Sequence, residues 1–139
     1  LQQLAGQRHC TAAFVRVHVA ESGLRADVRC AGHPPALVLH PGGVVETIGR
    51  PGHPLGILDE PTFLDDSAPL SPGDVLVLYT DGVTDAGGGD GGLGEEGLAD
   101  VVSAGDGLAP AALLGRIEAA VAERGSVRDD IALLAARVR

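Results

Sequence analysis

Lysine is absent from this sequence of 139 residues, and aromatic side chains are scarce, with one tyrosine, two phenylalanines and no tryptophan. The sequence has ten cationic and 19 acidic side chains, so the formal net charge is −9. No basic patch or stripe appears, which argues against nucleic acid or an anionic membrane as a partner. An acidic chain that acts on phosphate would need a metal ion to offset its own charge.

Long apolar runs and a cysteine framework are missing as well. No apolar stretch reaches the roughly 18–20 residues that cross a bilayer, and no signal peptide opens the chain. The two cysteines are too few for a disulfide-stabilised fold. These absences predict a cytoplasmic protein. The length suits one domain, so we expect residues 1–139 to form a single domain.

Alternation of apolar and polar residues predicts strands in the first half of the chain. The runs "TAAFVRVHV" and "LRADVRCA" alternate on either side of Glu21-Ser22-Gly23, which indicates a β-hairpin. The runs "ALVLH" and "VVETI" flank Pro41-Gly42-Gly43 and indicate a second hairpin. Three further strands are expected: an edge strand within "TFLDDSAPL", a central strand "VLVLY" and a last strand "IALLAARV".

Helical signals follow in the second half. One helix is expected to begin near residues 94–96, and another at Pro110, with Gly125 ending it. The apolar face of the second helix is Leu113, Leu114, Ile117, Ala120 and Val121. Residues 1–10 read as the end of a further helix. Hairpins followed by helices and a closing strand predict an α+β domain with antiparallel sheet.

Two acidic clusters are the first candidates for chemistry. Asp81-Gly82 follows the central strand, and Asp129-Asp130 precedes the last one. Taken singly, each cluster is more typical of a solvated turn. If both lie at one place, their carboxylates suit Mg²⁺ or Mn²⁺, and two such ions can activate water and hold a phosphoryl group. Spacing alone does not show that the clusters meet.

Histidines and cysteines offer a weaker alternative. If the first hairpin turns near Ser22, Cys10 lies roughly opposite His33, and a zinc site would need these two with His9 and Cys30. The spacing matches no standard zinc module, and buried cysteine is usually plain core. The same register puts Cys30 opposite Ala13 or Phe14, which argues against a Cys10–Cys30 disulfide. His33 and His53 stand in Gly-His-Pro triplets, where a role in positioning a loop is favoured over catalysis.

Four segments, taken in order, resemble one family. They are "CAGHPPALVLHPGGVVETI", "GHPLGIL", "LSPGDVLVLYTDGVTDA" and "RDDIALLAARV". Together they resemble the C-terminal part of a PPM-type protein phosphatase domain, in the branch named for sporulation stage II protein E (SpoIIE). The resemblance covers the chain from about Thr11 onward, and the ordered set is far more specific than any one segment.

The resemblance implies a fold, an activity and a site. The fold would be an α-β-β-α sandwich of antiparallel sheets, and the activity hydrolysis of phosphoserine or phosphothreonine on bacterial proteins with two Mn²⁺ or Mg²⁺ ions. The usual substrate in this branch is a phosphorylated STAS-type antagonist of an anti-sigma factor. Asp81 and Asp129 match the family's metal-binding aspartates, and Asp130 is the weaker choice beside Asp129. Gly82, which would let the chain turn away sharply after Asp81, and His33 would support the site.

One departure from the family matters most. The family carries an earlier metal-binding motif resembling Asp-x-Ser-Gly-His-Gly, whereas the first aspartate here is Asp27, in mid-hairpin. The resemblance therefore implies a sandwich incomplete at its N-terminal side and a chain that is inactive, or nearly so, by itself. An uncovered sheet edge and apolar face would favour self-association. The alternative function is a pseudophosphatase module that binds a STAS-type partner without hydrolysing it.

Overall fold

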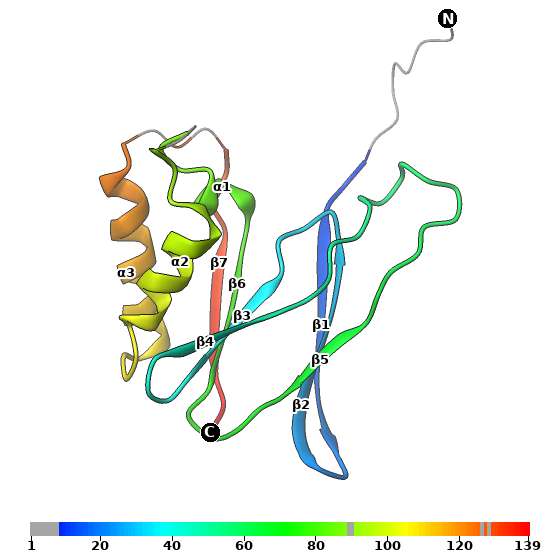
Figure 1. Ribbon diagram of the computed structural model, residues 1–139, viewed down its shortest axis with the longest axis horizontal. Coiled ribbons are helices and arrows are strands. Elements are labelled where there is room, and N and C mark those ends of the chain that lie inside the picture. Colours follow the sequence, from blue (N-terminus) through cyan, green and yellow to red (C-terminus); the bar gives the residue numbers. More distant parts are fainter. Residues whose placement is uncertain (1–8, 89–90, 126, 128) are drawn as a thin grey trace, which may run out of the picture. The chain divides into compact units, whose positions relative to one another are not determined.

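The computed structural model describes residues 9–88, 91–125, 127 and 129–139 (Figure 1). These residues form two compact units, each described here by itself. Unit 1 holds the described residues up to Pro35 together with Gly49–Pro69, and unit 2 holds Ala36–Ile48 and Leu70–Arg139. The helix end expected within residues 1–10 falls almost entirely outside the described residues. The single domain over residues 1–139 stays a prediction.

Unit 1 is built on a three-stranded antiparallel sheet in the order β1–β2–β5. The strands are β1 (Ala12–Ala20), β2 (Gly23–Ala31) and β5 (Asp66–Pro69). The first predicted hairpin is confirmed, and its turn needs Gly23, whose φ of 111° disfavours any residue with a Cβ. The predicted edge strand is confirmed too, although it is limited to four residues of the segment "TFLDDSAPL".

The register of the hairpin separates an apolar face from a charged one. Ala13 pairs with Cys30, one of the two predicted registers, and Val15 pairs with Val28. Because residues opposite each other share a face, these residues form the apolar side, where Val28 and Cys30 are buried. Arg16 pairs with Asp27 on the other face.

Unit 2 holds a four-stranded antiparallel sheet in the order β4–β3–β6–β7. Its strands are β3 (Ala36–His40), β4 (Val44–Ile48), β6 (Val75–Tyr79) and β7 (Leu133–Arg137). The second hairpin and the central position of "VLVLY" are confirmed, since β6 lies between β3 and β7. β7 is shorter than predicted, because Ile131 and Ala132 precede the strand.

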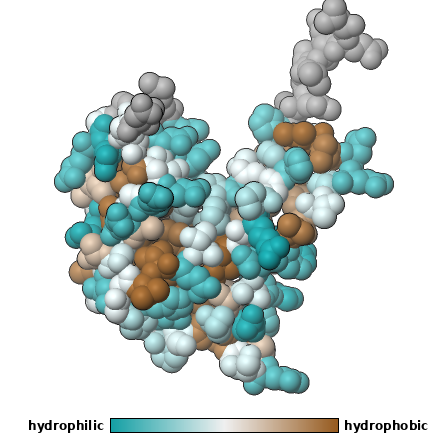
Figure 2. All heavy atoms as spheres, viewed as in Figure 1, coloured by the Kyte–Doolittle hydropathy of each residue, from teal (hydrophilic) through white to brown (hydrophobic). Residues whose placement is uncertain are grey.

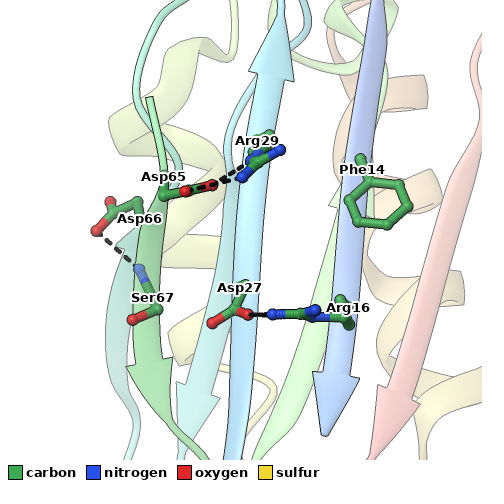
Figure 3. Close-up of a pocket in the computed structure, with 7 residues that line it drawn as sticks. All are labelled: Phe14, Arg16, Asp27, Arg29, Asp65, Asp66 and Ser67. Carbon is green, nitrogen blue, oxygen red and sulfur yellow. Dashed lines mark hydrogen bonds and ion pairs between the residues drawn. The ribbon is translucent and has the colours of Figure 1, made fainter. Parts of the chain in front are cut away.

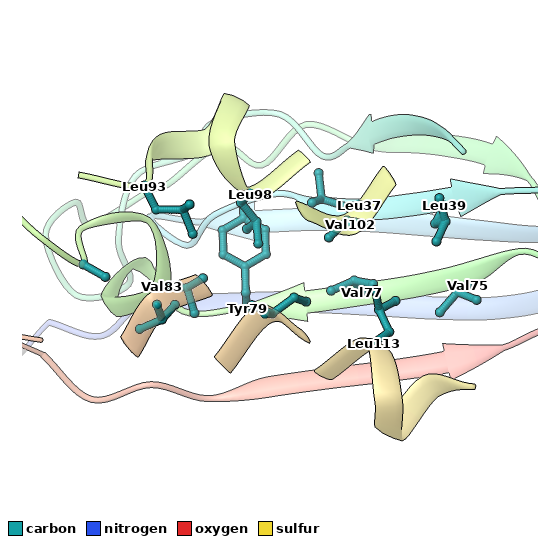
Figure 4. Close-up of a cluster of buried hydrophobic side chains, with 13 residues drawn as sticks. Leu37, Leu39, Val75, Val77, Tyr79, Val83, Leu93, Leu98, Val102 and Leu113 are labelled. Carbon is teal, nitrogen blue, oxygen red and sulfur yellow. The ribbon is translucent and has the colours of Figure 1, made fainter. Parts of the chain in front are cut away.

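Two helices, α2 (Gly94–Ser103) and α3 (Pro110–Glu123), pack against one face of this sheet (Figure 4). Pro110 occupies the first turn of α3, and Gly125, with φ of 88°, follows its end as predicted. The core between helices and sheet is aliphatic apart from Tyr79 and includes Leu37, Leu39, Val75, Val77, Leu98, Val102, Leu113, Ile117 and Val121. Each such side chain contributes about 1.5–3 kcal/mol by leaving water.

A short helix, α1 (Asp81–Thr84), corrects one expectation. The predicted sharp turn at Gly82 is wrong, because Gly82 lies inside α1 and is not among the glycines with positive φ. A single helical turn has no apolar repeat, so periodicity could not reveal it. The fold class, α+β with two antiparallel sheets, is confirmed. Within the described residues, no helix combines the length and the apolar character needed to cross a membrane.

Candidate metal site

The two acidic clusters lie side by side at one end of the β6–β7 pair in unit 2. Beyond the last paired residues of these strands, the amide of Thr80 donates to the carbonyl of Ala132 at 3.1 Å. The Thr80 hydroxyl donates to the carbonyl of Asp130 at 3.0 Å and accepts from the amide of Ala132 at 2.9 Å. We call the two adjoining segments, Thr80–Gly82 and Asp129–Ala132, the acidic corner.

Gly82 packs directly on the backbone of the second segment. A Cβ built on Gly82 would lie 2.6 Å from the carbonyl oxygen of Asp130 and 3.1 Å from that of Asp129. Real Cβ atoms do not approach backbone oxygen this closely, so glycine is required by the contact and not by its conformational freedom. The contact brings the residue that follows Asp81 against Asp129 and Asp130.

The three predicted ligand residues are all exposed in the acidic corner. Asp81 is the first residue of α1, and its carbonyl accepts bonds from the Asp85 amide and the Thr84 hydroxyl at 2.8 and 3.0 Å. Among the described residues, its carboxylate has no hydrogen-bond or ion-pair partner. One carboxylate oxygen of Asp129 accepts from the amide of Asp130 at 2.8 Å.

The donor set fits a hard divalent cation only in part. Exposed carboxylates on two adjoining segments are the ligands that Mg²⁺ and Mn²⁺ prefer. The described residues nevertheless contain no group of three or more His, Cys, Asp or Glu side chains arranged to hold an ion. The acidic corner therefore offers carboxylates of the right chemistry but not a complete set of protein ligands.

His33, the other predicted supporting residue, belongs to unit 1. Its ring is half-buried, and Nδ1 lies 2.9 Å from the carbonyl oxygen of Pro34, the next residue. His33 and the acidic corner lie in different units, so a shared role stays a prediction.

The zinc alternative fails on the position of Cys10. The β1–β2 pairing stops at Ala12, and the backbone of Cys10 pairs with Leu55 instead of facing His33. Both cysteines are free, and no metal-holding group is found in the part of the chain described. Cys30 is core, and burial together with the charge of Asp66 raises the pKa of its thiol.

Sequence reasoning missed a buried carboxylate at the opposite end of the sheet in unit 2. Asp74 is almost fully buried, and its Oδ1 lies 2.9 Å from Nδ1 of His40, whose Nε2 lies 3.1 Å from Glu46. The other oxygen of Asp74 accepts from the Ser71 amide at 2.7 Å. Burial alone would lower the pKa of His40, but the bonds to Asp74 and Glu46 outweigh it and raise that pKa.

A groove of about 420 Å³ crosses the charged face of the sheet in unit 1 (Figure 3). Its charges are largely paired, Arg16 with Asp27 at 2.7 Å and Arg29 with Asp65. The Arg16 hydrogen bond holds the pKa of Asp27 below its ordinary value, and Arg29 does the same for Asp65.

Apolar side chains reach the surface elsewhere in unit 1, where Leu55, Ile57, Leu58 and Leu64 are exposed (Figure 2).

Comparison with known proteins places the chain in a family. The family model described as Stage II sporulation protein E (SpoIIE) matches residues 1–139. Protein IcfG of Synechocystis is 41% identical over 56 residues, which are 40% of this chain and 9% of that protein. Phosphoserine phosphatase RsbP of Bacillus subtilis is 33% identical over 79 residues, which are 57% of this chain and 19% of that protein.

The fold agrees with a solved phosphatase domain. The phosphatase domain of the cell fate determinant SpoIIE from Bacillus subtilis superposes with a TM-score of 0.70 at 16% identity. The match covers 91% of this chain and 57% of that one. The chain thus spans only part of each protein that it matches. On the family match over its whole length, the chain belongs to the SpoIIE family and is part of a PPM-type phosphatase domain.

Proposed function

We propose that this chain carries part of the metal site of a phosphoserine/phosphothreonine protein phosphatase. The observation that supports the proposal is the acidic corner, in which segments far apart in sequence bring Asp81 next to Asp129 and Asp130. The hydrogen bonds of the Thr80 hydroxyl and the close packing of Gly82 hold the two carboxylate clusters next to each other.

Asp81 and Asp129 are the residues proposed to hold the metal, with Asp130 as the weaker candidate. The ions would be two Mn²⁺ or Mg²⁺, which supply a water of lowered pKa and neutralise charge on a phosphoryl group when bound. The chain's own contribution is to present carboxylates on a fixed backbone. A net charge of −9 would otherwise repel a phosphorylated substrate.

The proposed substrate is a serine- or threonine-phosphorylated STAS-type antagonist of an anti-sigma factor in the bacterial cytoplasm. Support comes from the family and from the relative named phosphoserine phosphatase RsbP. Dephosphorylation of such an antagonist would release a sigma factor. Recognition of this antagonist would depend on contacts with the partner outside the acidic corner.

We expect the chain alone to be inactive or nearly so. Mn²⁺ and Mg²⁺ need several oxygen ligands, and the described residues hold no group of three suitable side chains. The same observation favours the second candidate function, a pseudophosphatase module that binds the STAS-type protein without hydrolysing it.

Phosphate release from a serine-phosphorylated STAS protein tests the proposal. The assay compares the complete gene product with and without Mn²⁺, alongside Asp81→Asn and Asp129→Asn variants. Asp100→Asn, an exposed carboxylate on α2, is the matched control. We expect Mn²⁺-dependent release that both corner variants abolish and the control retains.

Two other outcomes are informative. Undiminished release by Asp81→Asn would remove Asp81 from the site and overturn the proposal. Binding of the phosphorylated STAS protein without any release, in the complete gene product with Mn²⁺, would establish the pseudophosphatase function instead.

A further inference from the structure

We propose that Thr80 is a positioning residue whose hydroxyl fixes Asp81 and Asp129 relative to each other for cation binding. The inference rests on the proposed function, since it assigns a role within the same site. Thr80 would not touch the ion. It would act through the backbone of the segment Asp129–Ala132.

The hydroxyl of Thr80 makes two hydrogen bonds to the same segment. It donates to the Asp130 carbonyl at 3.0 Å and accepts from the Ala132 amide at 2.9 Å. Both backbone groups lie just outside β7, where the regular pairing with β6 has ended at Leu133. The side chain therefore continues the connection between the two strands into the acidic corner.

The position of Thr80 makes this use of its hydroxyl unusual. Thr80 is the N-cap residue of α1, where a threonine side chain ordinarily accepts from a backbone amide in the first helical turn. Here the side chain makes no capping bond, although the backbone has the usual extended conformation, with φ −90° and ψ 159°. The hydroxyl instead makes its hydrogen bonds to the segment that carries Asp129 and Asp130.

Gly82 completes the restraint from the other side of Asp81. Thr80 and Gly82 both contact the Asp129–Ala132 segment, one through hydrogen bonds and the other through the close approach to Asp130. Asp81 thus lies between two residues, Thr80 and Gly82, that both contact the segment carrying Asp129, its proposed partner in metal binding. A β-branched side chain suits this role, because its χ1 rotation is restricted.

The consequence is a measurable effect on cation affinity. Loss of a group that orients a ligand without touching the metal typically lowers metal affinity about 10–100-fold. Thr80→Val keeps the shape of the side chain but removes both hydrogen bonds, and Thr80→Ser keeps the hydroxyl. Thr47→Val is the matched control, since Thr47 is an exposed threonine on β4 of the same sheet.

The test measures Mn²⁺ affinity of the complete gene product by electron paramagnetic resonance of the free ion, and hydrogen exchange of the Ala132 amide by NMR. We expect Thr80→Val to bind Mn²⁺ at least about 10-fold more weakly and to expose the Ala132 amide to faster exchange. Thr80→Ser and Thr47→Val should match the wild type in both. Thr80→Ala replaces the valine variant if that variant does not fold.

The outcomes separate this inference from the function on which it rests. Wild-type Mn²⁺ affinity in Thr80→Val overturns the role of Thr80 alone. Absence of Mn²⁺ binding by the wild-type complete gene product overturns both proposals, whereas hydrogen exchange at Ala132 would still show whether the hydroxyl restrains the acidic corner. An equal loss of affinity in Thr80→Ser would show that the hydroxyl is not the group responsible.

Discussion

The α-carbon of Gly82 lies so close to Asp130 that an added Cβ would stand 2.6 Å from its carbonyl oxygen. Gly82→Ala must therefore push the two halves of the acidic corner apart. We expect the variant to lose about 1–3 kcal/mol of unfolding free energy, the usual cost of overpacking. Urea unfolding followed by circular dichroism measures the loss.

Gly115→Ala provides the control for that experiment. Gly115 lies in α3, and nothing stands within 4 Å of a Cβ added there. Alanine in a helix should be better than glycine by about 0.5–1 kcal/mol. If Gly82→Ala proved as harmless as Gly115→Ala, the close packing of the acidic corner would be disproved.

His40 should make stability depend on pH. Its pKa is raised, because the bonds to Asp74 and Glu46 outweigh the burial of the ring, so protonated His40 favours the folded state. The contribution is full below the unfolded pKa of about 6.5 and is lost as pH rises through the folded pKa. We expect wild type to exceed His40→Gln in urea midpoint most at pH 6, with the difference shrinking toward pH 9. A difference that grows with pH would contradict the assignment.

The two cysteines should differ sharply in reactivity. Cys10 is exposed, whereas Cys30 is 2% exposed and its thiol pKa is raised by burial and by Asp66. Because the thiolate is the reactive form, Ellman's reagent should label one thiol rapidly and the second only after unfolding. Cys10→Ser should remove the rapid phase. Two rapid thiols in the folded wild type would contradict the burial of Cys30.

The unpaired edge of β1 and the exposed apolar side chains on this strand should promote self-association. β1 is an end strand of its sheet, and its side chains Val17 and Val19 are 50% and 81% exposed. We expect sedimentation velocity to show concentration-dependent association that Val19→Glu reduces. Ile57→Glu, which changes an exposed apolar loop residue, should leave it unchanged. Equal effects of both variants would indicate non-specific hydrophobic association and not association through β1.

Much of the fold was predictable because its elements carry strong local signals. Alternation predicted the first hairpin, the turn residues Pro41-Gly42-Gly43 predicted the second, and the 3.6-residue repeat with Pro110 predicted α3. The helix α1 was missed because one turn has no repeat. The zinc alternative assumed that the β1–β2 register continues to Cys10, whereas a loop residue, Leu55, takes that place.

The sequence predicts the acidic residues of the candidate site but not the contacts that bring them together. Acidic residues at strand ends, and a family resemblance, pointed to Asp81 and Asp129. Nothing local in the sequence says that Thr80 will bond to the carbonyl of Asp130, because a hydroxyl's partner across a sheet depends on register and chain reversal. The sequence predicts Gly82 as a turn residue, whereas its role in the fold is a tertiary contact with Asp130 that only the folded chain reveals.

Asp81 and Asp129 are proposed to bind one cluster of divalent cations. Mn²⁺ added to the isotope-labelled complete gene product broadens the NMR signals of nearby amides, which locates the bound ion directly. We expect broadening centred on residues 80–83 and 129–132, abolished by Asp81→Asn and preserved in Asp100→Asn. Broadening centred elsewhere, or unchanged by Asp81→Asn, would contradict this proposal.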